Sequence, residues 1–96
     1  MQQLTHASQI FSTTDDVSTA LLELVATLNE DDHSVAVAIP ALNHEGDVVE
    51  LAMTVNTASA FVVVPINATA DDERRIRPAS LAATTALRAQ ITTESS

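Results

Sequence analysis

Two stretches of alternating apolar residues, joined by a turn that holds the chain's single glycine, constrain the fold most strongly. In residues 34–39 valine and isoleucine alternate with alanine, and in residues 47–55 apolar side chains again occupy every second position. Because successive side chains of a strand point to opposite faces, this spacing predicts two strands, each with one buried face. Gly46 lies between them, where a tight turn needs a residue that tolerates positive φ. The pattern therefore predicts an antiparallel hairpin.

A third strand is predicted after this hairpin. Pro40 is expected to end the first strand, because proline cannot donate a backbone hydrogen bond. Residues 60–66 follow a second turn and are apolar on both faces. The three strands together predict an antiparallel meander.

Helical patterns flank the predicted sheet. Thr13 or Thr14 can cap a helix over residues 15–29, whose first turn holds two aspartates where the helix dipole favours negative charge. A single apolar stripe follows on this helix, formed by Val17, Leu21, Leu24, Val25 and Leu28. Residues 1–12 fit either a helical face or a short edge strand.

A second helix is predicted near the C-terminal end. Pro78 suits a first helical position, and a shorter helical segment over residues 71–76 can precede it. Residues 93–96 are expected to fray. The positions that mark the helix are Leu81, Thr84, Leu87, Arg88 and Ile91.

These elements predict an α+β fold, a single domain of residues 1–96 in two layers. Its order is helix, three-stranded antiparallel meander, helix, with both helices packed on one face of the sheet. The opposite face would keep apolar side chains in water, and the third strand would leave an open edge. We therefore expect a homodimer that buries that face or edge. The side chains concerned are Ala36, Ala38, Ala52, Val62 and Val64.

Charge is divided sharply along the chain. Residues 1–73 carry twelve Asp or Glu and no Lys or Arg, whereas residues 74–96 carry four Arg against one Glu. This split disfavours direct nucleic-acid binding, because phosphate contacts need a spread of Lys and Arg. It favours a cationic protein partner, or a solvated acidic surface with no partner. Acidity of this kind also suits a salt-adapted cell.

Several functional classes find no support in the sequence. There is no cysteine, which excludes disulfides and thiolate chemistry. No signal-peptide pattern occurs, and residues 60–66 are too short to cross a membrane, so we expect a soluble cytoplasmic protein. One glycine cannot build a nucleophile elbow or a phosphate loop, and the three histidines lack zinc-site spacing. We therefore expect no enzyme, no cofactor and no metal.

Two groups of residues are candidates for contact. The acidic groups around the first hairpin are expected to meet a protein partner: Glu30, Asp31, Asp32, Glu45, Asp47 and Glu50. A second group is expected to contact another subunit: Arg74, Arg75, Arg77, Val62 and Val64. Alternatively, these arginines form i,i+4 pairs within their own helix, Asp71 with Arg75 and Glu73 with Arg77.

The leading hypothesis is a small non-enzymatic protein-binding or regulatory module. It would act through its acidic surface and an apolar sheet face or edge. Three alternatives stay open: a self-assembling structural subunit whose acidity serves solubility, an inhibitor that mimics nucleic acid, and a ligand-sensing module with a pocket between sheet and helices.

Overall fold

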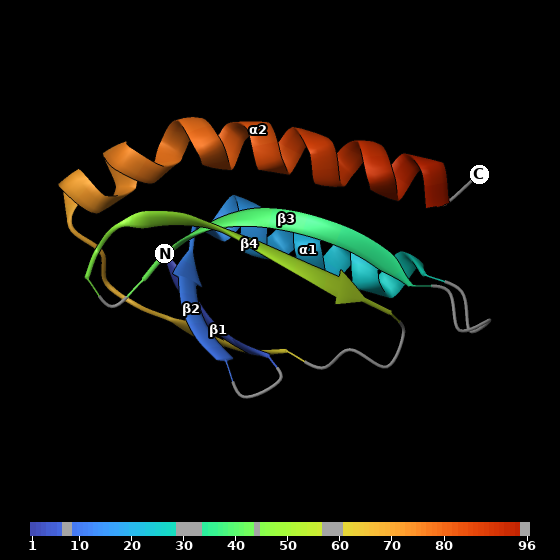
Figure 1. The fold of residues 1–96 in the computed structure, drawn as a ribbon, viewed down its shortest axis with the longest axis horizontal. Coiled ribbons are helices and arrows are strands. Elements are labelled where there is room, and N and C mark those ends of the chain that lie inside the picture. Colours follow the sequence, from blue (N-terminus) through green and yellow to red (C-terminus); the bar gives the residue numbers. More distant parts are fainter. Residues whose placement is uncertain (7–8, 29–33, 44, 57–60, 95–96) are drawn as a thin grey trace.

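The computed structural model describes residues 1–6, 9–28, 34–43, 45–56 and 61–94. The protein is α+β, with a five-stranded antiparallel sheet and two helices (Figure 1). In chain order the elements are β1 (Gln2–His6), β2 (Gln9–Thr13), α1 (Asp15–Thr27), β3 (Val35–Leu42), β4 (Val48–Val55), β5 (Val62–Pro65) and α2 (Ala70–Glu94).

The N-terminal segment that sequence left ambiguous contains strands β1 and β2. Leu4 pairs with Phe11 across this hairpin and both are buried, whereas the next pair, Thr5 and Ile10, turns to the opposite face. β2 lies inside the sheet, between β1 and β3, and is not an edge strand. A single large apolar residue on each strand's inner face gives too little alternation for sequence to identify the hairpin.

The predicted meander is wrong in its third strand. The strand order is β4-β3-β2-β1-β5, so β5 pairs with β1 instead of β4. This pairing places Val63 opposite Leu4, where it packs against the core. An apolar run after a turn identified β5 as a strand, but a strand that is apolar on both faces does not reveal which strand it pairs with.

Pro40 does not end β3, which continues through it to Leu42. The carbonyl of Pro40 accepts a hydrogen bond of 2.7 Å from Thr13 Oγ1, so this residue's hydrogen-bonding side faces β2. The missing N–H would also have faced β2, because both groups of a strand residue point the same way. Proline is tolerated here because the β3–β4 ladder needs no donor from it.

Helix α1 confirms its prediction. Thr14 is the N-cap, and its Oγ1 accepts a hydrogen bond of 3.4 Å from the Val17 amide. The predicted apolar stripe faces the core, with Val17, Leu21 and Leu24 fully buried. Thr14 also contacts Ser80 through their hydroxyl groups, which joins the beginning of α1 to α2.

Helix α2 is one continuous helix, not a short segment followed by a second helix that begins at Pro78. Pro78 lies inside it and is exposed, with no N–H to offer the carbonyl of Arg74. The predicted stripe is only partly right, since Leu87 is buried but Leu81 is 60% exposed. Thr93 and Glu94, predicted to fray, belong to the helix. The stripe that packs inward is Ile76, Ser80, Ala83, Leu87 and Ile91.

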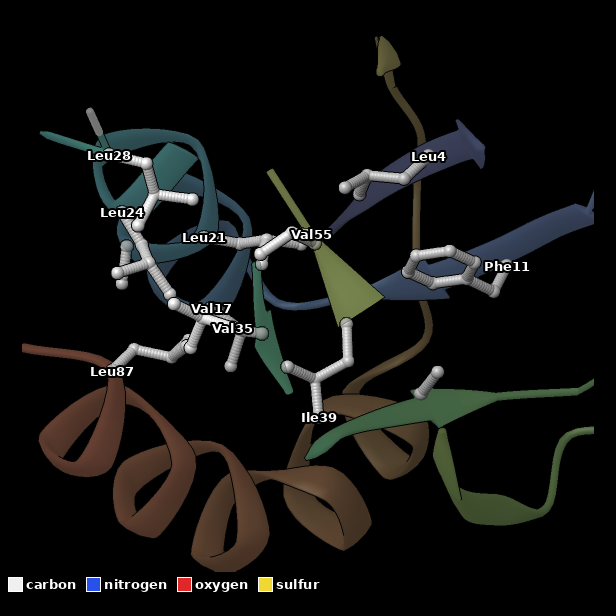
Figure 2. Close-up of a cluster of buried hydrophobic side chains, with 12 residues drawn as sticks. Leu4, Phe11, Val17, Leu21, Leu24, Leu28, Val35, Ile39, Val55 and Leu87 are labelled. Carbon is white, nitrogen blue, oxygen red and sulfur yellow. The ribbon is translucent and has the colours of Figure 1, made fainter. Parts of the chain in front are cut away.

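One core joins these elements. Figure 2 shows Leu4 and Phe11 from β1 and β2, Ile39 from β3 and Val55 from β4 converging on Leu21 of α1. Leu87 of α2 belongs to the same cluster, so both helices contribute to one core. Helix α2 also lies beside the other face of β3 and β4, where its Ala79 and Ala82 line a hollow together with Ala38 and Glu50. In the described part of the chain, neither helix has the length and apolarity needed to span a membrane.

Candidate protein-binding surfaces

Strands β1, β2 and β5 contain no Asp, Glu, Lys or Arg. On their outer side Ile10, Val62 and Val64 are 55%, 61% and 46% exposed. Thr5 pairs with Ile10 on one side and with Val62 on the other, which places these two side chains on one face. We call Ile10, Val62 and Val64 the apolar face. Sequence identified its two valines and missed Ile10, because β2 was not recognised as an internal strand.

The turn between β3 and β4 carries the second surface. Asn43 organises it: its Oδ1 accepts hydrogen bonds from the amides of Glu45 at 2.9 Å and Asp47 at 3.0 Å. Gly46 has φ of +80° and donates to the Asn43 carbonyl at 3.0 Å, which confirms the predicted need for glycine. The carboxylates of the turn therefore project from an ordered backbone.

We call the exposed residues Glu45, Asp47 and Glu50 the acidic hairpin. Glu45 and Asp47 belong to the turn, and Glu50 lies on the outer side of β4. Glu30, Asp31 and Asp32 were predicted to join them, but these three lie outside the described residues. The structure thus describes three of the six predicted acidic residues, and all three are exposed on one hairpin.

The predicted oligomer contacts fall on different elements. Val62 and Val64 belong to β5, whereas the arginines belong to α2. Arg74 pairs with Asp71 at 3.2 Å and Arg75 with Asp72 at 2.5 Å, so the pairs span i,i+3 and not the predicted i,i+4. Arg77 is exposed. The Arg75 guanidinium also stands beside the acidic hairpin, 3.6 Å from where a Cβ on Gly46 would lie.

A hollow of about 420 Å³ opens where β2 and β3 diverge. Within the described residues these strands pair only at Ser12 and Leu42. The first residues of β2 therefore lie apart from the turn that joins β3 to β4. The hollow is lined by Phe11, Leu51 and neighbouring Gln, Asn and aliphatic residues. No Asp, Glu, His, Lys or Arg is among its described lining residues, so it offers no acid–base pair.

Comparison with known proteins gives no relative, since no family model, curated protein or solved structure matches the chain. Among the residues placed by the structure, no group of three or more His, Cys, Asp or Glu could hold a metal ion. Any functional interpretation therefore rests on the two surfaces, the apolar face and the acidic hairpin.

Proposed function

We propose that this protein is a small non-enzymatic binding module that holds a cationic protein partner on the acidic hairpin. The observation that carries the proposal is the hydrogen-bonded turn, which holds the exposed residues Glu45 and Asp47 and leads into the strand that carries exposed Glu50. Carboxylates on a hydrogen-bonded turn lose less backbone entropy on association than carboxylates on a loose segment. They also steer an oppositely charged partner toward one site.

The electrostatic setting of the hairpin supports a cationic partner. The chain carries a net charge of −9, and the described parts of β3 and β4 contain no Lys or Arg. The nearby cation, Arg75, is paired with Asp72. The hairpin therefore keeps a negative field toward solvent, which attracts basic surfaces and repels acidic ones.

Charge reversal with a matched control tests this function. The variant Glu45→Lys/Glu50→Lys changes the hairpin, and Asp16→Lys/Glu23→Lys makes the same change in net charge on exposed positions of α1. Partners are captured from host extract on each protein at ~50 mM salt and washed at ~300 mM, where screening weakens exposed pairs. We expect a stoichiometric basic partner that the hairpin variant binds about tenfold more weakly or worse.

Two results would contradict the proposal. Unchanged binding by the hairpin variant would show that the hairpin is not the contact. Equal loss in both variants would show that only net charge matters, which favours acidity serving solubility. Circular dichroism of each variant establishes that the fold is retained.

A homodimer formed through the apolar face is a second candidate, and it corresponds to the self-assembling alternative. The specific observation is that this face combines three exposed aliphatic side chains with strands that carry no Asp, Glu, Lys or Arg. Two copies with a charge of −9 each repel one another. They would approach at the lowest electrostatic cost where their surfaces are uncharged.

A further inference from the structure

The sheet has two edges, and they differ in what they offer to another chain. β4 forms one edge with eight residues, and β5 forms the other with four. Within the described residues no strand pairs with the outer side of either. An unpaired edge presents backbone donors and acceptors to solvent, which makes it a template for an added strand.

The direction of the β4 backbone groups follows from its neighbour. Pro40 turns its carbonyl toward β2, so alternate residues of β3 face β2 and the others, including Ile39, face β4. Ile39 pairs with Leu51 and Pro40 pairs with Glu50. Leu51 therefore bonds to β3, and Glu50 points its N–H and C=O away from the sheet. The same alternation turns four residues outward: Val48, Glu50, Ala52 and Thr54.

The β5 edge is less able than the β4 edge to pair with an added strand. The amide of Ile66 donates to the Met1 carbonyl at 3.1 Å, so Ile66 and, by alternation, Val64 face β1. Val63 and Pro65 then face outward, and Pro65 has no N–H to donate. A short strand with an outward proline is a common device against edge pairing. The longer β4 edge, in contrast, contains no proline.

Side chains define what kind of strand fits β4. On the inner side Leu51 and Met53 are only half-buried, so they leave apolar surface for a neighbour to cover. On the outer side the one charged residue is Glu50. An antiparallel strand at this edge would place side chains beside Glu50 on the outer face and beside Leu51 and Met53 on the inner face.

We infer that the outer edge of β4 binds an extended segment of the cationic partner as an additional antiparallel strand. This inference rests on the proposed function and specifies its chemistry: apolar residues at every second position, with basic residues between them. A second copy of this chain fits the edge less well, because it would bring Glu50 and its net charge of −9 to an acidic strand.

The probe that tests the inference is the peptide acetyl-KVKVKVK-amide. In the inferred pairing its lysines lie on the face of Glu50, opposite the outward residues of β4, so the lysine amides donate to β4 and the valine amides point away. Backbone N-methylation of the valines should leave binding unchanged. N-methylation of the lysines should weaken it about tenfold or more, because N-methylation removes the donors and crowds the edge.

Amide hydrogen exchange of the protein provides the second measurement. Binding of the peptide should slow exchange at Glu50, Ala52 and Thr54 and leave Leu51 and Met53, already bonded to β3, little changed. Equal binding of the two methylated peptides, or binding without this alternating protection, would overturn the inference. Protection of the same amides in the peptide-free protein, rising with protein concentration, would assign the edge to a second copy and would also overturn it.

A protein variant separates this inference from the proposed function. Ala52→Pro removes one outward donor and none that bonds to β3, and Ala52→Val keeps the donor as a matched control. We expect Ala52→Pro to lose the captured partner and the peptide while Ala52→Val retains both. If Glu45→Lys/Glu50→Lys loses the partner but Ala52→Pro keeps it, strand addition is wrong and the acidic-hairpin function stands. The peptide experiment is independent of any folding defect in Ala52→Pro.

Discussion

The two halves of the sheet differ in almost every property that governs association. Strands β1, β2 and β5 carry no Asp, Glu, Lys or Arg, expose Ile10 and Val62, and end in an edge with an outward proline. Strands β3 and β4 carry the acidic hairpin and end in a longer edge without proline. Figure 1 shows the two strand pairs diverging, with β1 and β2 (blue) separate from β3 and β4 (green).

Within the sheet, acidic charge is confined to one half, whereas the outer face of β5 exposes Val62 and Val64 without any charge. Exposed acids also lie on both helices, for example at Asp16 and Asp71. We therefore propose different contacts for the two halves of the sheet: a second copy of the chain for the uncharged half, and a basic partner for the acidic half.

The largest expected effect concerns the core that holds the two halves together. Leu4 of β1 and Ile39 of β3 are both fully buried in the same cluster. Replacing either by alanine should lower the free energy of unfolding by about 2–5 kcal/mol, because each leaves a cavity. Urea titration followed by circular dichroism should show one transition in both variants. A separate early transition in Leu4→Ala alone would show that the halves are independent.

The next effect concerns the apolar face. Ile10→Asp places a charge on the face proposed to bury against a second copy, so the dimer dissociation constant should rise about thirtyfold or more. Sedimentation velocity over a concentration series measures this change. Leu81→Asp is the control, because Leu81 is 60% exposed on α2 and lies outside the apolar face. Wild-type protein that stays monomeric at ~1 mM, a concentration at which millimolar affinities are detected, would refute the homodimer.

Sequence predicted the elements with strong local signals. The stripe from Val17 to Leu24 gave α1 within two residues of its observed end, and alternation gave the β3–β4 hairpin with its turn at Gly46. These features depend on residues close together in the chain. Helix capping, helical spacing and the need for positive φ each depend on a few neighbouring residues, so they can be recognised in a single sequence.

Long-range pairing was not predictable from the same signals. Nothing local in β5 distinguishes pairing with β4 from pairing with β1. Pro40 would end β3 only if its missing N–H were needed for pairing with β4, and the sequence does not show which neighbouring strand that side of Pro40 faces. Likewise, the acidic hairpin was found from charge alone, but the open edge beside Glu50 depends on the position of β4 in the sheet. The candidate residues were therefore partly predictable, and the surface to which they belong was not.

A smaller effect is expected at the turn that orders the acidic hairpin. Gly46 has φ of +80°, a conformation that costs a residue with a Cβ about 1–2 kcal/mol. Gly46→Ala should therefore destabilise the protein by this amount, and Gly46→Asn by less, because asparagine tolerates positive φ. The added Cβ would lie 3.6 Å from Arg75 Nη2, an ordinary contact, so the cost is in the backbone. Thermal unfolding that gives the same loss for both variants would place the cost in side-chain contact instead.

The smallest effect on stability is expected for Arg75→Gln, and it tests the field of the acidic hairpin most directly. The Arg75–Asp72 pair is exposed, so its loss should change the free energy of unfolding by less than about 1 kcal/mol. Affinity for the cationic partner should nevertheless rise about two- to threefold at low salt, because a positive charge beside Gly46 is removed.

Arg88→Gln provides the matched control for this comparison. It changes the net charge equally and breaks a similarly exposed pair, Arg88 with Glu23 at 2.7 Å, but lies about 20 Å further along α2. That distance exceeds the screening length at physiological salt, so its effect on partner affinity should be much smaller. Titration calorimetry at two salt concentrations measures both variants. Equal gains would mean that the partner senses only the total charge of the molecule, and the distinction between the acidic and the uncharged half would have no role in binding.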